Sequence, residues 1–285
     1  MTYTEEAVSF TCGHDMLLGV LARPDVPAQT GVLILVGGPQ YRVGSHRQFV
    51  LLSRELATAG YAVLRFDVRG MGDSEGDPRD FLSTGADIAA AITALQRAVP
   101  SASQVALWGL CDGASAALLY CFDTLDSRVR ALCLVNPWVR SESSLARTRV
   151  KHYYLNRLMR AGFWIKLLRG GIKLDAIGGL GRSAWIALRG DRQSPPKSTF
   201  QQRMAAAWDA FSGRIFLLLS ADDYVAKEFL EHAAHDGAWR NALTHPHLVR
   251  HDESGADHTF SSAALRARVA ELTLKHSLYH PRDEV

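Results

Sequence analysis

The sequence predicts a doubly wound α/β fold, and three observations lead to this prediction. Short apolar runs bounded by Gly, Asp or Pro alternate with amphipathic helical patterns along most of the chain. The runs are apolar throughout, which is typical of parallel strands covered on both faces. The 285 residues, 47% hydrophobic and 21% charged, can bury a core that offsets the chain entropy, so a mainly disordered chain is excluded.

The expected strands and helices follow one another as such a fold requires. A hairpin over residues 9–22 is expected at the N-terminal edge of the sheet. Six apolar runs are the other expected strands: residues 32–36, 62–67, 105–108, 131–135, 215–219 and 248–251. Apolar residues recur at three- and four-residue steps in two expected helices, 48–59 and 87–98, and a third helical run covers 114–120.

The alternation stops between residues 140 and 211. That stretch has no strand-like run and is rich in Arg, Lys, Trp, Tyr and Leu. An unstructured loop of this length would be unusual inside a compact domain. We therefore predict a helical cap, residues 140–211, inserted after the sixth strand, with residues 1–139 and 212–285 forming the α/β core.

The basic residues are concentrated in the predicted cap. The chain has 32 Lys and Arg against 29 Asp and Glu, a net charge of +3, which does not point to a nucleic-acid partner. Residues 140–214 hold 15 basic and 4 acidic residues, so this segment carries +11 and the rest of the chain −8. Two interpretations stay open: a helix with solvated basic flanks, or a docking surface for an acidic acyl carrier protein, a coenzyme A thioester or an anionic membrane.

Cysteine usage and the N-terminal sequence predict a cytoplasmic protein. The four cysteines form no C-x-x-C pair, and reduced thiols are the simplest interpretation. The N-terminus lacks the pattern of a secretory signal, and no uncharged apolar run reaches the length that spans a bilayer. His245, His247 and His251 lack an acidic partner in the sequence pattern, so we interpret them as solvated side chains and expect no metal site.

The most informative segment is Gly109-Leu110-Cys111-Asp112-Gly113. It lies between a predicted strand and a predicted helix, which is the context of a nucleophile elbow. Flanking glycines suit a strained turn that leaves no room for side chains, and a helix N-terminus favours a thiolate or an oxyanion. Cys111 is therefore the candidate nucleophile. The competing interpretation is a small buried cysteine whose glycine neighbours merely allow close packing.

The segment DVRGMGDS, residues 67–74, precedes the elbow in the chain, and this combination resembles the α/β-hydrolase superfamily. The resemblance implies an oxyanion hole built from two backbone N–H groups, one from the loop GGPQ and one from the residue after the nucleophile. Asp112 then supplies the second N–H. Pro39 has no N–H to donate, so the loop donor is Gln40 or Gly38, and we favour Gln40.

The same resemblance implies a catalytic acid and base. The superfamily carries its acid shortly after the strand at 215–219, which points to Asp223, with Asp222 as the alternative. It carries its histidine in the loop GADHTF, which is His258, and the order nucleophile, acid, histidine is that of α/β hydrolases. The implied chemistry needs no cofactor: Cys111 forms an acyl thioester that water or another acceptor releases.

Four segments are similar to a narrower group, the exosortase-A-associated hydrolases of the first type: GGPQYRVGSHRQF, LRFDVRGMGDSEG, LWGLCDGASAALLY and LLLSADDYVAKEF. This group consists of serine-aminopeptidase-like hydrolases encoded with bacterial exopolysaccharide and protein-sorting systems. The cysteine at the elbow belongs to the resemblance. We expect Tyr41 and Arg42 of the GGPQYR segment, and Phe163 and Trp164 of the cap, to contact the substrate.

Three functions stay open at this point. The leading hypothesis is an ester or thioester hydrolase, or an acyltransferase, that uses Cys111, His258 and Asp223. A peptidase or lactone hydrolase could use the same triad. A non-catalytic protein of this fold could instead hold an anionic acyl carrier or a lipid, and it would form no acyl adduct on Cys111.

Overall fold

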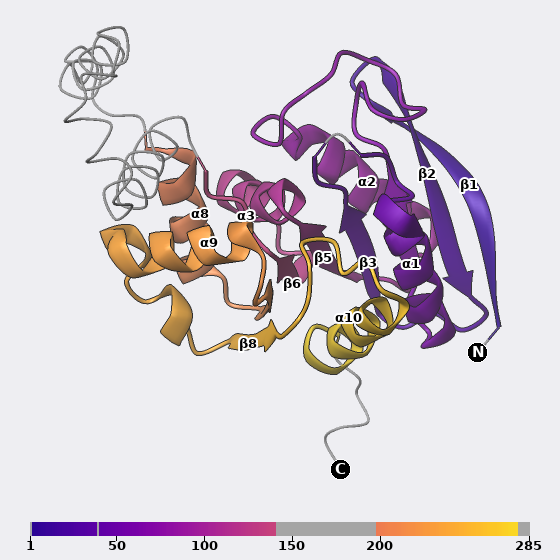
Figure 1. Ribbon diagram of the computed structural model, residues 1–285. Coiled ribbons are helices and arrows are strands. Elements are labelled where there is room, and N and C mark those ends of the chain that lie inside the picture. Colours follow the sequence, from indigo (N-terminus) through magenta and orange to yellow (C-terminus); the bar gives the residue numbers. More distant parts are fainter. Residues whose placement is uncertain (1, 39, 141–197, 279–285) are drawn as a thin grey trace, which may run out of the picture. The chain divides into compact units, whose positions relative to one another are not determined.

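The computed structural model describes residues 2–38, 40–140 and 198–278, and their strands form one eight-stranded sheet (Figure 1). The strand order is β1-β2-β4-β3-β5-β6-β7-β8. The strands are β1 (Tyr3–Cys12), β2 (Asp15–Pro24), β3 (Thr30–Leu35), β4 (Val63–Phe66), β5 (Gln104–Leu110), β6 (Val129–Val135), β7 (Arg214–Ser220) and β8 (Leu248–Glu253). Strand β2 pairs antiparallel with β1 and β4, and every later pair is parallel. The predicted mostly parallel, doubly wound sheet is confirmed.

Helices cover both faces of this sheet (Figure 1). One face is covered by α1 (Gln48–Thr58) and α10 (Ala263–His276), and the other by α2 (Gly85–Ala98), α3 (Asp112–Thr124), α8 (Phe200–Ala210) and α9 (Tyr224–His235). Three short 3-10 helices complete the described elements: η1 (Ser45–Arg47), η3 (Gly237–Trp239) and η4 (Ala242–Thr244). Because successive side chains of a strand point to opposite faces, Leu33 and Leu35 join one core and Val32 and Ile34 the other. This is why the strands read as continuous apolar runs.

The parallel strands bring the candidate site residues to one edge of the sheet. Strands β3, β5, β7 and β8 all run in the same direction. The chain leaves β5 at Leu110 and β7 at Ser220, directly before Cys111 and Asp223. His258 follows the end of β8. Ligands of open α/β sheets bind at the carboxyl ends of the strands, where these segments meet.

The C-terminal end of the predicted cap differs from the structure. We expected the insertion to end at residue 211, but Ser198 and the residues after it belong to the same compact unit as the N-terminal 139 residues. Helix α8 packs on α3, and its Trp208 is fully buried against Trp239 and Phe229. The patterning suggested a cap because α8 follows the insertion without an intervening strand. Most of the predicted cap, with Phe163 and Trp164, lies outside the described residues.

All four cysteines carry free thiols. Cys12, Cys121 and Cys133 are buried, whereas Cys111 is partly exposed. No helix in the described ranges is long and apolar enough to cross a membrane.

Candidate active site

Cys111 stands on a sharp turn between β5 and α3. Its backbone has φ 59° and ψ −124°, a left-handed conformation that costs energy in a residue with a side chain. The N–H of Cys111 donates to the Val135 carbonyl at 2.9 Å, which ties the turn to β6. A Cβ on Gly109 would lie 2.5 Å from the backbone N of Ala114, so this position requires glycine. The turn therefore has the local geometry expected of a nucleophile elbow.

His258 and Asp223 are joined by a direct hydrogen bond. Nδ1 of His258 lies 2.7 Å from Oδ2 of Asp223, and the Asp223 side chain is largely buried. Asp223 also caps α9 by accepting a hydrogen bond from the N–H of Ala226 at 3.3 Å. This second contact fixes the carboxylate relative to the helix. Asp222, the alternative acid, is exposed to solvent.

His258 and Asp223 shift each other's pKa in opposite directions. The hydrogen bond with Asp223, and after it the one with Cys111, raises the pKa of His258 to about 10, although burial acts in the opposite direction. Burial raises the pKa of Asp223, but the hydrogen bond and charge of His258 outweigh it, so this pKa lies below its ordinary value. The imidazolium form of His258 is thereby favoured at neutral pH. The structure thus brings Cys111, His258 and Asp223 together.

Two buried polar residues that the sequence analysis did not single out support the histidine loop. Asn136, at the end of β6, donates from Nδ2 to Oγ of Ser220 at 2.9 Å and to the carbonyl of His258 at 3.2 Å. Ser220 donates from Oγ to the carbonyl of Asp257 at 2.9 Å. The available signal was the asparagine-proline pair that ends a predicted strand, because a polar residue there faces the carboxyl edge of the sheet.

The loop after β3 does not present the N–H group that we favoured. The N–H of Gln40 donates to the Gly38 carbonyl at 2.8 Å, and its side-chain Oε1 accepts hydrogen bonds from Ser45. The N–H of Gly38 donates to Oδ1 of Asp112 at 2.5 Å. Both candidate loop donors are therefore already hydrogen-bonded in this structure.

Arg42, one of the expected substrate contacts, lies in a charged cluster. Its guanidinium pairs with the buried Asp67 and with Asp73, 2.6 Å away. The N–H of Asp73 and the backbone N–H of Arg42 also donate to the Asp67 carboxylate. A Cβ on Gly72 would lie 2.2 Å from that carboxylate, which explains a glycine in this motif. The motif DVRGMGDS thus holds its loop together, while Tyr41 remains 48% exposed.

The sequence matches the Alpha/beta hydrolase family over residues 32–284. The chain belongs to this family. Among curated proteins, none matches the sequence.

Solved structures share the fold of this α/β hydrolase at low sequence identity. An esterase of Pyrococcus furiosus, Pf2001, is 15% identical with a TM-score of 0.62, and the alignment covers 97% of this chain and 94% of the esterase. An α/β serine hydrolase homologue of Coxiella burnetii is 16% identical, with a TM-score of 0.59 and coverages of 96% and 98%. Est1E of Butyrivibrio proteoclasticus, solved with ferulic acid, is 14% identical, with a TM-score of 0.59 and coverages of 95% and 99%.

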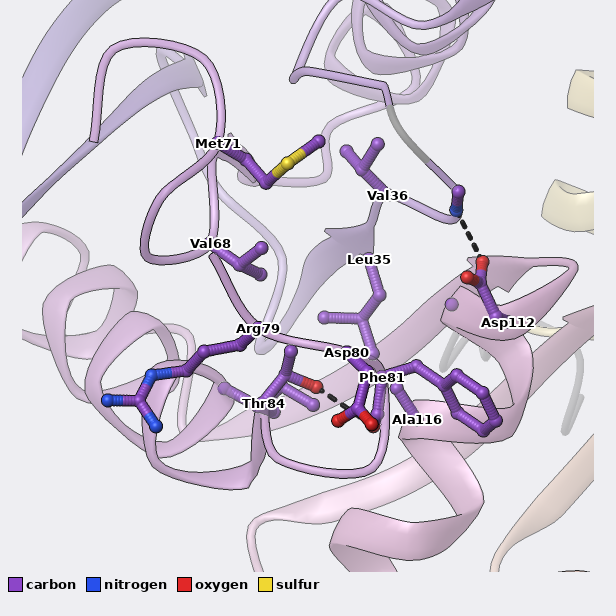
Figure 2. Close-up of a pocket in the computed structure, with 13 residues that line it drawn as sticks. Leu35, Val36, Val68, Met71, Arg79, Asp80, Phe81, Thr84, Asp112 and Ala116 are labelled. Atoms are coloured by element: carbon purple, nitrogen blue, oxygen red, sulfur yellow. Dashed lines mark hydrogen bonds between the residues drawn. The ribbon is translucent and has the colours of Figure 1, made fainter. Parts of the chain in front are cut away.

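A pocket of about 270 Å³ lies beside the elbow of this α/β hydrolase (Figure 2). Its walls are mainly apolar, with Leu35, Val36, Val68, Met71, Phe81, Ile88 and Ala116. Asp112 and Gly113, the two residues after Cys111, line it as well.

The described residues contain no group of three His, Cys, Asp or Glu side chains arranged to hold a metal ion. The rings of His245 and His247 lie 5.6 Å apart. His251 does have an acidic partner, contrary to our expectation, because its Nε2 lies 2.9 Å from Oε2 of Glu253. This contact is a pairing between alternate residues along β8.

Proposed function

We propose that this α/β hydrolase cleaves an ester or thioester by covalent catalysis at Cys111. The observation that carries the proposal is the hydrogen bond between His258 and Asp223 beside the strained elbow at Cys111, which also raises the pKa of His258. In this arrangement Asp223 holds the tautomer and orientation of the imidazole, and His258 exchanges a proton with the sulfur and the leaving group.

The proposed reaction has two halves. The Cys111 thiolate attacks the carbonyl carbon, a C–S bond forms, and the carbonyl oxygen becomes an oxyanion. The oxyanion collapses, the bond to the leaving alcohol or thiol breaks, and His258 gives its proton to that group. Water then attacks the thioester while His258 accepts a proton from it. The C–S bond breaks, which releases the acid and restores the thiolate.

The mainly apolar pocket beside Asp112 supports an apolar acyl group as part of the proposal. Two of the structural neighbours are described as an esterase and as a protein with bound ferulic acid, which agrees with an ester substrate. An acceptor other than water would make the same enzyme an acyltransferase. The proposal also includes membership of the exosortase-A-associated hydrolases, on the similarity of the four sequence segments. It includes a cytoplasmic location, which the four free thiols support.

The test is to incubate the protein with p-nitrophenyl butyrate and with butyryl-coenzyme A and to record intact-protein mass and product release. We expect a butyryl adduct on Cys111 and turnover, and we expect Cys111→Ala to lose both. Cys121→Ala, which changes a buried thiol on the same helix α3, is the matched control and should retain both. Turnover that survives in Cys111→Ala would contradict the proposed nucleophile. A protein that forms neither adduct nor product would fit the non-catalytic binding alternative.

A further inference from the structure

The carboxylate of Asp112 occupies a position surrounded by backbone N–H groups. Its Oδ1 accepts the hydrogen bond from Gly38, drawn as a dashed line at Asp112 in Figure 2. The nearby backbone N–H groups of Asp112 itself and of Gly113 also act to lower the pKa of this carboxyl group. The loop after β3 therefore directs a backbone N–H at a side chain of the first residue of α3.

The Gly38 N–H is one of the two donors that an oxyanion would need. In this family the hole is formed by the N–H of the residue after the nucleophile, here Asp112, and by an N–H from the loop after β3, here occupied by Gly38. Gln40 cannot replace Gly38 in this arrangement, because its own N–H donates to the Gly38 carbonyl. A carboxylate oxygen resembles the oxyanion in charge and in hydrogen bonding, so Asp112 presents an internal substitute for it.

The backbone around the carboxylate is closely packed. A Cβ on Gly37 would lie 2.4 Å from Oδ1 of Asp112 and 2.2 Å from the Leu110 carbonyl oxygen. A Cβ on Gly113 would lie 2.5 Å from the Leu35 carbonyl oxygen. Glycine at these two positions lets the β3 loop and the start of α3 approach until their N–H groups reach a common point. A substrate oxygen can therefore accept from the Gly38 N–H only if the Asp112 carboxylate leaves it.

We propose that Asp112 controls acylation of Cys111 by occupying the oxyanion hole of the free enzyme, so that a substrate must displace its carboxylate before the tetrahedral intermediate can form. The inference rests on the proposed function. Two negatively charged oxygens cannot share the same N–H donors, because each would raise the energy of the other in a site partly shielded from water.

Burial disfavours the ionised form of Asp112 at its present position. Burial raises the pKa of Asp112 above its ordinary value, even though the N–H groups of Gly38, Asp112 and Gly113 act in the opposite direction. The hydrogen bonds therefore do not fully compensate the ionised carboxylate for lost hydration, and that hydration is regained when the side chain turns outward. Asp112 also lines the apolar pocket, so an acyl group that fills the pocket contacts the side chain that has to move.

Two reactions of Cys111 separate this role from a simple effect of charge on the thiolate. Acylation by p-nitrophenyl butyrate needs the oxyanion hole, whereas alkylation by iodoacetamide displaces iodide at carbon and does not. We therefore measure both rates, with intact-protein mass to confirm modification at Cys111, in the wild type, Asp112→Ala and Asp112→Asn. The ratio of the acylation rate to the alkylation rate is the readout.

We expect Asp112→Ala to raise this ratio by about tenfold or more, since a single oxyanion-hole donor is worth about 100-fold in rate. Asp112→Asn keeps an oxygen for the Gly38 N–H but has no charge, so its ratio should lie between those of the wild type and Asp112→Ala. Asp123→Ala removes a carboxylate from the other end of α3, where Asp123 pairs with Arg203 at the surface, and should leave the ratio unchanged.

Equal changes of both rates in the Asp112 variants would overturn the inference while leaving Cys111 as the nucleophile. A ratio that falls in Asp112→Ala would overturn it too, because the carboxylate would then assist acylation. Alkylation of Cys111 without acylation in the wild type and in every variant would refute the proposed function and, with it, the inference. The near-isosteric Asp112→Asn variant preserves a test if Asp112→Ala fails to fold.

Discussion

Nδ1 of His258 lies 2.7 Å from Oδ2 of Asp223, although 35 residues separate them in the chain. Asp223 follows β7 and His258 follows β8, and the two strands are adjacent and parallel. The hydrogen bond therefore joins two loops at the same edge of the sheet. Because both partners are ionised, it couples the stability of this edge to pH and the orientation of His258 to one carboxylate.

Removal of the Asp223 carboxylate is expected to lower activity strongly. Asp223→Asn keeps the shape of the side chain but cannot hold the imidazolium, so kcat/KM for p-nitrophenyl butyrate should fall by about 1,000-fold or more. Asp222→Asn is the matched control, because the neighbouring carboxylate is exposed, and its kcat/KM should stay within about twofold of the wild type. The reverse order of effects would assign the acid to Asp222.

The same pair predicts a pH-dependent stability. His258 has a raised pKa of about 10, so its contribution is complete below its ordinary pKa of about 6.5 and is lost as the pH rises toward 10. The pKa of Asp223 is lowered, so its contribution is present above about pH 4 and is lost as the pH falls through the lowered value. Wild type and Asp223→Asn should therefore differ most between about pH 4 and 6.5.

We expect that maximum difference to be about 1–2 kcal/mol in the free energy of unfolding, because His258 is partly exposed to solvent. Urea denaturation of both proteins at about pH 3, 5.5 and 9.5 measures it. A difference that stays constant across this range would show that the pair does not titrate as described.

Gly109 at the elbow is expected to contribute to the stability of the folded protein. Gly109→Ala would place a Cβ 2.5 Å from the backbone N of Ala114, so the turn must open, and we expect a loss of about 1–3 kcal/mol in stability. Gly85→Ala, at the first residue of α2, places its Cβ where no atom lies within 4 Å, and should be neutral or slightly stabilising. Thermal unfolding compares them, and equal midpoints would contradict the packing argument.

The positive charge of the predicted cap predicts that binding of an anionic substrate carrier weakens as the salt concentration rises. If the net +11 of residues 140–214 reflects a docking surface, raising the ionic strength from about 0.05 to 0.5 M should increase KM for a thioester on an acidic acyl carrier protein far more than KM for a neutral ester. Equal salt effects on the two substrates would favour the alternative of a helix with solvated basic flanks. Steady-state kinetics at two ionic strengths decides between them.

Much of the site was predictable because its markers are local. Two glycines flank Cys111 between a strand and a helix, and this local pattern indicates the elbow. The order of the candidate nucleophile, acid and histidine along the chain is that of α/β hydrolases. The choice between Asp222 and Asp223 was not fully determined by the sequence, since adjacent residues of a turn can exchange roles. The structure places Asp223 against His258 and leaves Asp222 exposed.

The sequence by itself determined the doubly wound sheet and the identity of the residues at its carboxyl edge, because apolar periodicity and glycine turns are properties of short segments. Only the tertiary structure decided where Asp112, Arg42 and α8 lie. The Asp112 carboxylate meets the Gly38 N–H, Arg42 pairs with Asp67, and α8 packs on α3, each across many residues of chain. These contacts join segments that are far apart in the chain, and a local sequence pattern does not specify which distant segments meet.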